Sequence, residues 1–337
     1  MTHELKNIVA AFLNAQKSGL RTVLTTVVAL EGSSYRKPGV RMLIREDGQM
    51  IGAVSGGCVE KEVLRQAESV LNDNIPKVMT YDGRYRLGCE GILYILIEPF
   101  KPSNSFIEQF EMVLKKRESF KIASHFFKKN ETNLGFGSVF SLQGNNFFLR
   151  NDFKPEDGSA IFEQEMPPRF KLLIIGSEHD AVQLCSYASM TGWEVTIATV
   201  ASEEKNISDF PGAVEFISGL PEELDVATID NQTAVILMTH SYVKDLKYLL
   251  RLKDCNPVYL GILGPSSRRE KLLNEFLERC PEVSDNFFDI IHGPAGLNIG
   301  AETPQEIAIS IISEILALIR NQNPISLKDK SGSIHSS

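Results

Sequence analysis

The chain of 337 residues is too long for one ordinary hydrophobic core, so its length predicts two domains. An apolar fraction of 43% and a charged fraction of 23% are typical of folded globular proteins, which excludes general disorder. The formal net charge of −8 argues against nucleic acid as the main partner, because phosphate binding depends on clustered Lys and Arg.

The amino-terminal segment 1–19 interrupts its apolar residues with polar ones, so it lacks the unbroken hydrophobic stretch of a signal peptide. No run approaches the roughly 20 apolar residues of a membrane helix. An odd number of cysteines without any C-x-x-C pair favours reduced thiols and gives no support to a structural zinc site. We therefore expect a cytoplasmic protein without a membrane segment. The five cysteines are Cys58, Cys89, Cys185, Cys255 and Cys280.

In the first part of the chain the hydrophobic period predicts a small mixed α/β domain over residues 1–100. The expected helices span 4–17 and 59–71, and the expected strands span 22–30, 39–47, 48–57 in part, and 91–100.

Residues 101–168 are less regular and are expected to connect two domains. A helix is predicted over 104–116, followed by short strands with Asn- and Gly-rich turns. The segment 153–170, "FKPEDGSAIFEQEMPPRF", has the prolines and acidic residues of an inter-domain connection, so we place the boundary there.

From 169 to 323 strands alternate with helices, which predicts a Rossmann-like, doubly wound parallel sheet covered by helices on both faces. The polar tail 324–337 is expected to be disordered. The expected strands are 171–176, 194–199, 214–217, 234–240, 257–264 and 288–294, and the expected helices are 179–190, 242–252, 267–278 and 304–320.

The stretch "AVSGGCVEKEV", residues 53–63, places a cysteine between a glycine pair and the start of a helix. Gly56 and Gly57 let a ligand approach the backbone closely. The first turn of a helix favours anions and lowers the pKa of a cysteine, so Cys58 should have thiolate character. The alternative is that the glycines form a turn and Cys58 fills a small core pocket.

Two further stretches add polar groups to the first domain. Cys89 lies in "YRLGCEG" just before a strand, where it can share a cleft with Cys58, form a disulfide or be unrelated to it. Ser33, Ser34 and Arg41 lie in "EGSSYRKPGVRMLI", whose hydroxyls and cations suit an oxyanion or phosphate. The alternative for this loop is a solvated basic hairpin tip.

The expected first strand–helix turn of the second domain, "LLIIGSEHDAVQL", departs from a dinucleotide-binding glycine loop. Gly176 and Ala181 fit the pattern, but Glu178 replaces its second glycine and adds negative charge. The next strand ends at Thr199, where an acid would bond a ribose. These departures make NAD(P) binding doubtful and leave the fold prediction intact.

Other polar residues follow strands of the same sheet, and ligands of open α/β sheets bind beyond the carboxyl ends of the strands. Thr239 and His240 follow one strand; Gly264, Arg268 and Arg269 follow another, at the start of a helix that suits a phosphate. The alternatives are a turn with a capping serine, a solvated arginine pair and a histidine without function.

With these stretches together the chain resembles the XdhC/CoxI family, the xanthine dehydrogenase accessory factors. The resemblance covers nearly the whole chain except the middle segment and the tail. It rests on "GSSYRKPGVRMLI", "GAVSGGCVE" and "LGCEG" in the first domain, and on "LLIIG", "MTHSYVKDL", "YLGILGPSSRREKL" and "IHGPAGLNIGAETPQEIAISIISEI" in the second.

The resemblance implies an N-terminal XdhC/CoxI domain joined to a C-terminal Rossmann domain. It implies a cytoplasmic chaperone that transiently binds molybdenum cofactor (molybdopterin or its dinucleotide form), and favours cofactor insertion over an enzymatic activity without excluding one. Such a chaperone aids sulfuration of the cofactor with a cysteine desulfurase and passes it to a xanthine dehydrogenase-type apoenzyme.

Carried over by position, the resemblance places Cys58 near the metal centre and Cys89 near the cofactor. In the glycine loop, Gly176 and His179 match the family's G-x-G-H pattern and Glu178 departs from it. The full set of cofactor-binding candidates is Ser33, Ser34, Arg41, Ser55, Gly56, Gly57, Cys58, Glu60, Cys89, Gly176, His179, Thr239, His240, Gly264, Arg268 and Arg269.

Two other functions fit parts of the sequence: a nicotinamide-dependent oxidoreductase, from the Rossmann-like half, and an interaction scaffold without a ligand, from the altered glycine loop. A symmetric homodimer is expected, formed through the apolar faces of the first and last helices.

Overall fold

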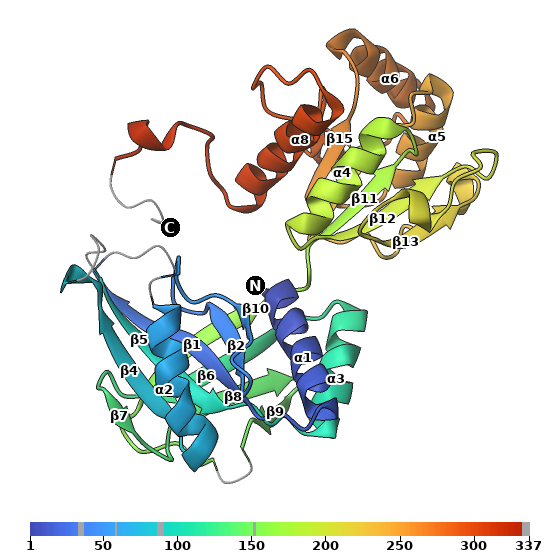
Figure 1. Cartoon of the computed structure of the whole chain (residues 1–337). Helices are drawn as coiled ribbons and strands as arrows, with labels where there is room; N and C mark the ends of the chain where they lie inside the picture. The colour runs from blue at the N-terminus through green and yellow to red at the C-terminus, as the bar shows by residue number, and fades with distance from the viewer. Residues whose placement is uncertain (33–36, 58, 86–90, 151–152, 332–337) are drawn as a thin grey trace. The chain divides into compact units, whose positions relative to one another are not determined.

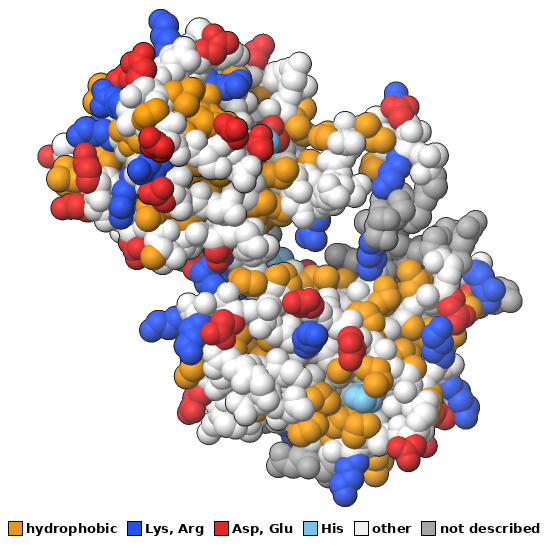
Figure 2. Space-filling view, turned by 180° about the vertical axis from the view of Figure 1, so that it is seen from behind, with side chains coloured by type: hydrophobic (Ala, Val, Ile, Leu, Met, Phe, Trp, Pro, Cys, Tyr) orange, Lys and Arg blue, Asp and Glu red, His pale blue; other side chains and the backbone are white. Residues whose placement is uncertain are grey.

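The computed structural model describes residues 1–32, 37–57, 59–85, 91–150 and 153–331. The chain forms two compact units, Met1–Pro168 and Arg169–Ser337, each with its own sheets and core (Figure 1). On the face seen in Figure 2, Lys and Arg side chains are interspersed with Asp and Glu on both units.

A six-stranded antiparallel sheet forms the centre of the first unit, in the order β3-β2-β1-β5-β4-β7. Its central strand is rich in β-branched residues and is buried on both faces over most of its length, which suits a strand covered on two sides. One face packs on α2 (Glu60–Asp73). The strands are β1 (Thr22–Glu31), β2 (Arg41–Arg45), β3 (Met50–Gly52), β4 (Lys77–Asp82), β5 (Ile92–Pro99) and β7 (Glu131–Thr132).

The other face of this sheet shares a core with two helices and a second sheet, of order β10-β6-β8-β9. The helices are α1 (Thr2–Lys17) and α3 (Asn104–Lys116). The strands of the second sheet are β6 (Phe120–Phe126), β8 (Gly137–Leu142), β9 (Asn145–Phe148) and β10 (Ala160–Met166).

The segment 153–170, expected to be a connection, differs in the structure because it contains β10, which pairs with β6 over seven residues. Gln164 and Met166 point into the core, while Glu163 and Glu165 lie on the other side of the strand, with Glu165 exposed. The acidic residues that suggested a linker therefore lie on the outer face of an edge strand, where charge prevents unwanted pairing. Strand β4 was not predicted either.

The second unit is a six-stranded parallel sheet of order β13-β12-β11-β14-β15-β16, which confirms the Rossmann-like prediction. Two helices, α4 (His179–Met190) and α8 (Pro304–Ile319), share a core with one face, and α5 (Tyr242–Leu252) and α6 (Ser266–Arg279) share a core with the other. The strands are β11 (Lys171–Ile175), β12 (Glu194–Thr199), β13 (Ala213–Ser218), β14 (Thr233–Leu237), β15 (Tyr259–Ile262) and β16 (Ile291–His292).

Smaller elements complete the described chain. The expected strand over 288–294 is replaced by the end of a short helix, α7 (Asp285–Asp289), and the two-residue β16, because the Ser284 hydroxyl caps the helix. Four 3-10 helices lie at Gly83–Tyr85, Ile207–Asp209, Pro221–Glu223 and Leu327–Asp329. The last of these belongs to the tail 324–337, of which residues 332–337 lie outside the described part.

The apolar faces of α1 and α8, from which a homodimer was expected, are used inside the units. Leu5, Ile8 and Phe12 of α1 belong to the first core, and Ile311 and Ile315 of α8 belong to the second. The homodimer therefore remains a prediction, but the apolar faces of α1 and α8 no longer support it. In the described part of the chain, no helix has the length and apolar character to cross a membrane.

Candidate functional site

The loop between β3 and α2 carries the glycine pair and is held by two side chains from within. Glu60, the first residue of α2, accepts hydrogen bonds from the Ser55 amide at 2.7 Å and the Ser55 hydroxyl at 2.5 Å. The Ser55 hydroxyl oxygen in turn accepts from the amides of Gly57 and Val59 at 3.1 and 3.3 Å. The side chains therefore fix the course of the loop before any ligand binds.

Glu60 keeps its charge although it is only 8% exposed. Burial opposes ionisation of this carboxyl, but the hydrogen bonds from Ser55 outweigh it and lower its pKa. A buried, negatively charged anchor thus lies behind the loop.

The outer side of the loop is open. A Cβ placed on Gly56 or Gly57 would meet no described atom within 4 Å, and Gly57 has a φ of +117°, which favours glycine. Gly56 has no positive φ, so packing among the described residues gives no reason for glycine there. Open space above a glycine is what close approach of a ligand to the backbone requires.

Four of the predicted site residues, Ser33, Ser34, Cys58 and Cys89, lie outside the described residues. Cys58 follows the described glycine pair directly in the sequence.

Arg41, expected among the cations of an exposed loop, is instead only 5% exposed at the start of β2. Its Nη1 donates to the Gly39 carbonyl at 3.0 Å and to Gln164 Oε1 at 2.5 Å. Burial lowers the pKa of Arg41 to about 10, against the opposing field of Glu98. The side chain therefore joins β2 to β10 and is not presented on the loop.

In the second unit, the polar residues found at strand ends meet along the carboxyl edge of the sheet. Gly176 follows β11 with a φ of +144°, and a Cβ there would collide with the Met238 carbonyl oxygen. Glu178 caps α4 through its backbone, and Glu178 and His179 are both exposed. The glycine loop is thus formed as expected, with Glu178 at its outer surface.

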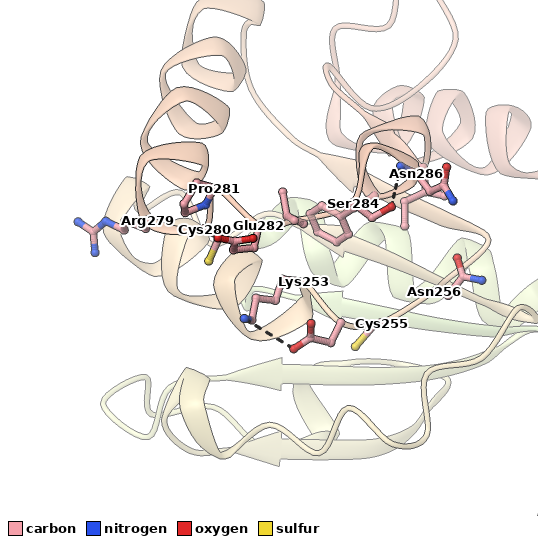
Figure 3. Close-up of a pocket in the computed structure, with 13 residues that line it drawn as sticks. Lys253, Cys255, Asn256, Arg279, Cys280, Pro281, Glu282, Ser284 and Asn286 are labelled. Atoms are coloured by element: carbon pink, nitrogen blue, oxygen red, sulfur yellow. Dashed lines mark hydrogen bonds and ion pairs between the residues drawn. The ribbon is translucent and has the colours of Figure 1, made fainter.

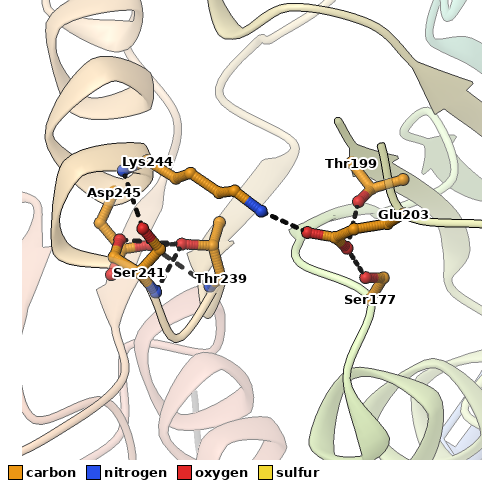
Figure 4. A network of polar contacts seen from close by, with 7 residues as sticks. All are labelled: Ser177, Thr199, Glu203, Thr239, Ser241, Lys244 and Asp245. Atoms are coloured by element: carbon orange, nitrogen blue, oxygen red, sulfur yellow. Dashed lines mark hydrogen bonds and ion pairs between the residues drawn. The ribbon is translucent and has the colours of Figure 1, made fainter. Parts of the chain in front are cut away.

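Glu203 accepts hydrogen bonds from three sides at this edge (Figure 4). The hydroxyl of Thr199, at the end of β12, donates to Glu203 Oε2 at 2.7 Å, and the Ser177 hydroxyl donates to the same oxygen. Lys244 of α5 pairs with Oε1 at 2.5 Å. Burial opposes the charge on Glu203, but Lys244 and Thr199 outweigh it and lower the pKa of the carboxyl.

A second network lies beyond β14 (Figure 4). Asp245, which is 1% exposed, accepts from the Thr239 hydroxyl at 2.6 Å and pairs with Arg268 at 2.6 Å. Arg269 donates to the Gly293 carbonyl at 3.1 Å. Thr239 and Arg268 are thus brought together, while Gly264 packs against the Arg268 side chain.

His240 follows Thr239 with a φ of +56°, an unusual conformation for a residue other than glycine. Its Nε2 lies 3.5 Å from Asp180 Oδ2, in the first turn of α4. This pair connects the loops after β11 and β14, where the strand order of the sheet reverses. Such a reversal is the usual place for a ligand in an open α/β sheet.

Sequence reasoning missed Glu203, Lys244, Asp245 and Asp180. An acid was sought at the end of the second strand, and Thr199 was found there. Glu203 lies four residues further on, in "TVASEEK", and reaches back to the Thr199 hydroxyl. Extending the search for an acid a few residues beyond the strand would have found it.

At the other edge of the same sheet, Cys255 and Cys280 line a cavity of about 670 Å³ between the ends of α5 and α6 (Figure 3). Both are free thiols, and burial raises the pKa of Cys255. Across the described ranges of the chain, no group of three or more His, Cys, Asp or Glu side chains is arranged to hold a metal. The cavity therefore presents two thiols without a metal-ligand set among the described residues.

Comparison with known proteins gives matches in both units. Residues 15–82 match the model of the XdhC and CoxI family, and residues 172–315 match the XdhC Rossmann domain.

Two curated proteins are similar to this chain over most of their length. A probable xanthine dehydrogenase subunit of Bacillus subtilis (strain 168) is 28% identical over 318 residues, which cover 87% of this chain and 92% of that protein. The molybdenum cofactor insertion chaperone PaoD of Escherichia coli (strain K12) is 26% identical over 329 residues, covering 96% and 91%.

A solved structure shares the fold. The crystal structure of a xanthine dehydrogenase from Bacillus halodurans matches with a TM-score of 0.76 and 26% sequence identity, covering 96% of this chain and 98% of that one. The similarity therefore extends over both units.

Proposed function

The chain belongs to the XdhC and CoxI family, and we propose that it binds molybdenum cofactor and delivers it to a xanthine dehydrogenase-type apoenzyme. The names of its relatives support this role, since one is a molybdenum cofactor insertion chaperone and the other belongs to a xanthine dehydrogenase.

The observation that carries the proposal is the β3–α2 loop, which is fixed from within by Ser55 and Glu60 and open above Gly56 and Gly57. A cofactor with phosphate, dithiolene sulfur and an oxidised metal needs backbone amides within reach and a sulfur-compatible contact. The loop offers the Gly56 backbone, while the Gly57 amide already donates to the Ser55 hydroxyl, and Cys58 follows in the sequence. We assign Cys58 the contact to the metal centre or its sulfur.

Reduced thiols suit such a contact. Cys185, Cys255 and Cys280 are free, in agreement with a reducing compartment, and we place the protein in the cytoplasm.

The test is retention of molybdenum cofactor through anaerobic gel filtration by the purified full chain. Wild type should retain the cofactor, Cys58→Ser should lose most of it, and Cys255→Ser, a half-buried thiol of the other unit, should match wild type. Retention by none of the three proteins would overturn the proposal. Equal retention by all three would remove Cys58 from the site and leave the binding role.

We further assign this chain a part in sulfuration, together with a cysteine desulfurase. The measurement is activation of a xanthine dehydrogenase apoenzyme by cofactor and desulfurase, with and without this protein. Faster activation with wild type than with Cys58→Ser is expected. Activation that is independent of the chain would remove both sulfuration and delivery from its function.

A further inference from the structure

Two buried side chains of the first unit, Arg41 and Thr26, have polar atoms without a hydrogen-bond partner among the described residues. Arg41 of β2 is 5% exposed and Thr26 of β1 is 0% exposed. The atoms without a partner are Nε and Nη2 of Arg41 and the hydroxyl oxygen of Thr26. Buried polar groups are normally hydrogen-bonded, because leaving one without a partner costs free energy. These atoms therefore call for a ligand.

The two side chains lie on the same face of the six-stranded sheet. Thr26 and Arg41 are directly paired across β1 and β2. Side chains paired in this way project to the same face, with Cβ atoms about 4.5–5.5 Å apart. This face packs against the second sheet, where Gln164 of β10 accepts from Arg41 Nη1. The two side chains are therefore neighbours in the layer between the sheets.

The edge of Arg41 that lacks a partner has the geometry that binds anions. Nε and Nη2 form one side of the planar guanidinium and present parallel N–H donors. In Arg65 of α2 the same pair of atoms donates to both oxygens of the Glu62 carboxylate, at 3.1 and 2.6 Å. Among the described residues no carboxylate does this for Arg41, since Glu98 and Glu4 act on it only at longer range.

We propose that a chloride ion binds in the layer between the two sheets, held by Arg41 Nε and Nη2 and by the Thr26 hydroxyl. All three groups can donate a hydrogen bond, and a halide can accept all three bonds, whereas a water molecule would leave the buried charge unbalanced. A divalent oxyanion such as sulfate would add a second charge whose burial is costly. This inference does not rest on the proposed function.

The test is hydrogen exchange of the full chain, measured by mass spectrometry, in sodium chloride or in sodium gluconate at the same ionic strength. Gluconate is monovalent but too large for a site closed by two sheets. A Kd of about 50 mM would raise the ratio of closed to open protein about fivefold at about 200 mM chloride. Exchange in β1 and β2 should slow by about that factor or more, while β11 and β14 of the second unit should exchange equally in both salts.

Two neighbouring threonines supply a matched pair of variants. Thr26→Val removes one donor to a charged ligand, so it should weaken chloride binding about tenfold or more and make exchange nearly independent of chloride. Thr25 is also 0% exposed, but it lies on the opposite face of β1 and its hydroxyl donates to the Met42 carbonyl at 3.0 Å. Thr25→Val should therefore keep the chloride dependence of wild type. Thermal melting checks that each variant folds.

Bromide locates the ion directly. Crystals of the full chain grown in sodium bromide should show an anomalous scattering peak beside Nε and Nη2 of Arg41. If no anion binds there, Thr26→Val only removes a buried hydroxyl without a partner, and it should stabilise the protein equally in both salts.

Three outcomes would overturn the inference: equal exchange of β1 and β2 in the two salts, a chloride dependence that Thr26→Val shares fully with wild type, or no bromide peak beside Arg41. Because none of these measurements contains molybdenum cofactor, their failure is distinguishable from failure of the proposed function.

Discussion

Gly39 and Gly56 of the first unit differ in whether the fold requires a glycine at that position. At Gly39 a Cβ would lie 2.5 Å from Gln164 Nε2, and the φ is +99°, so the fold itself requires glycine. At Gly56 neither reason exists among the described residues. A residue that folding does not require is a candidate for function.

We therefore predict that Gly56→Ala leaves stability within about 0.5 kcal/mol of wild type but reduces retention of molybdenum cofactor. Gly39→Ala, the matched control, should lower the free energy of unfolding by about 1–3 kcal/mol. Chemical denaturation and anaerobic gel filtration measure the two effects. A Gly56→Ala protein that is stable and retains cofactor normally would remove this loop from the binding site.

A buried carboxyl gives the first unit a pH dependence. Glu98 is 3% exposed and accepts hydrogen bonds from the Ser138 amide and hydroxyl at 2.9 and 2.6 Å. Burial raises its pKa to about 7, although Ser138 and two arginines act in the opposite direction. The folded state therefore holds a proton on Glu98 at a pH where the unfolded chain has lost it.

Because the folded pKa exceeds the unfolded one, this carboxyl's contribution to stability is complete below about pH 4.5 and is lost as pH rises to about 7. The loss is up to about 3 kcal/mol. The denaturation midpoint of wild type should decrease as the pH is raised from 5 to 7.5, and that of Glu98→Gln should change less over the same range. Parallel pH profiles of the two proteins would show that Glu98 does not titrate in this range.

Strand β10 is held to the main sheet of its unit through a side-chain contact. Gln164 is buried on β10 and accepts from Arg41 Nη1 at 2.5 Å, while the Nε and Nη2 atoms of Arg41 have no partner among the described residues. The connection between β2 and β10 thus depends strongly on a few hydrogen bonds.

Gln164→Ala should destabilise the protein by about 1–3 kcal/mol, because a buried guanidinium loses an acceptor. Glu165→Ala, at the exposed neighbouring position on β10, should change stability by less than about 0.5 kcal/mol. Urea denaturation followed by circular dichroism makes the comparison. Similar values for the two variants would mean that β10 contributes little through Arg41.

The chain divides into Met1–Pro168 and Arg169–Ser337, whose cores differ in architecture. The first unit includes β10, the last strand before the division, and needs no residue of the second to complete its sheets.

Each half should therefore fold when expressed alone. We predict cooperative thermal transitions for fragments 1–168 and 169–323, the first lost when the fragment is shortened to 1–150, because β10 is removed. Circular dichroism melting is the measurement. A folded fragment 1–150 would contradict the place given to β10 in the first unit.

Several features could be predicted from residues that are close together in the chain. They include the alternation of strands and helices after residue 171, the helix expected over 304–320, which the Thr303 side chain caps in the structure, and the glycine loop after β11. Each depends on a local signal, namely a buried run of apolar residues, helical periodicity or a capping side chain. The family resemblance was also carried by short continuous motifs.

Features that join distant residues became visible only in the folded chain. Strand β10 forms because β6, about 40 residues earlier, offers its edge, and Arg41 is buried because Gln164 on that strand accepts from it. Glu203 takes the place of the acid sought at Thr199 because the chain folds back after β12. Hydrophobic period reports which residues are buried, but not which partner from another segment completes a hydrogen bond or a cavity wall.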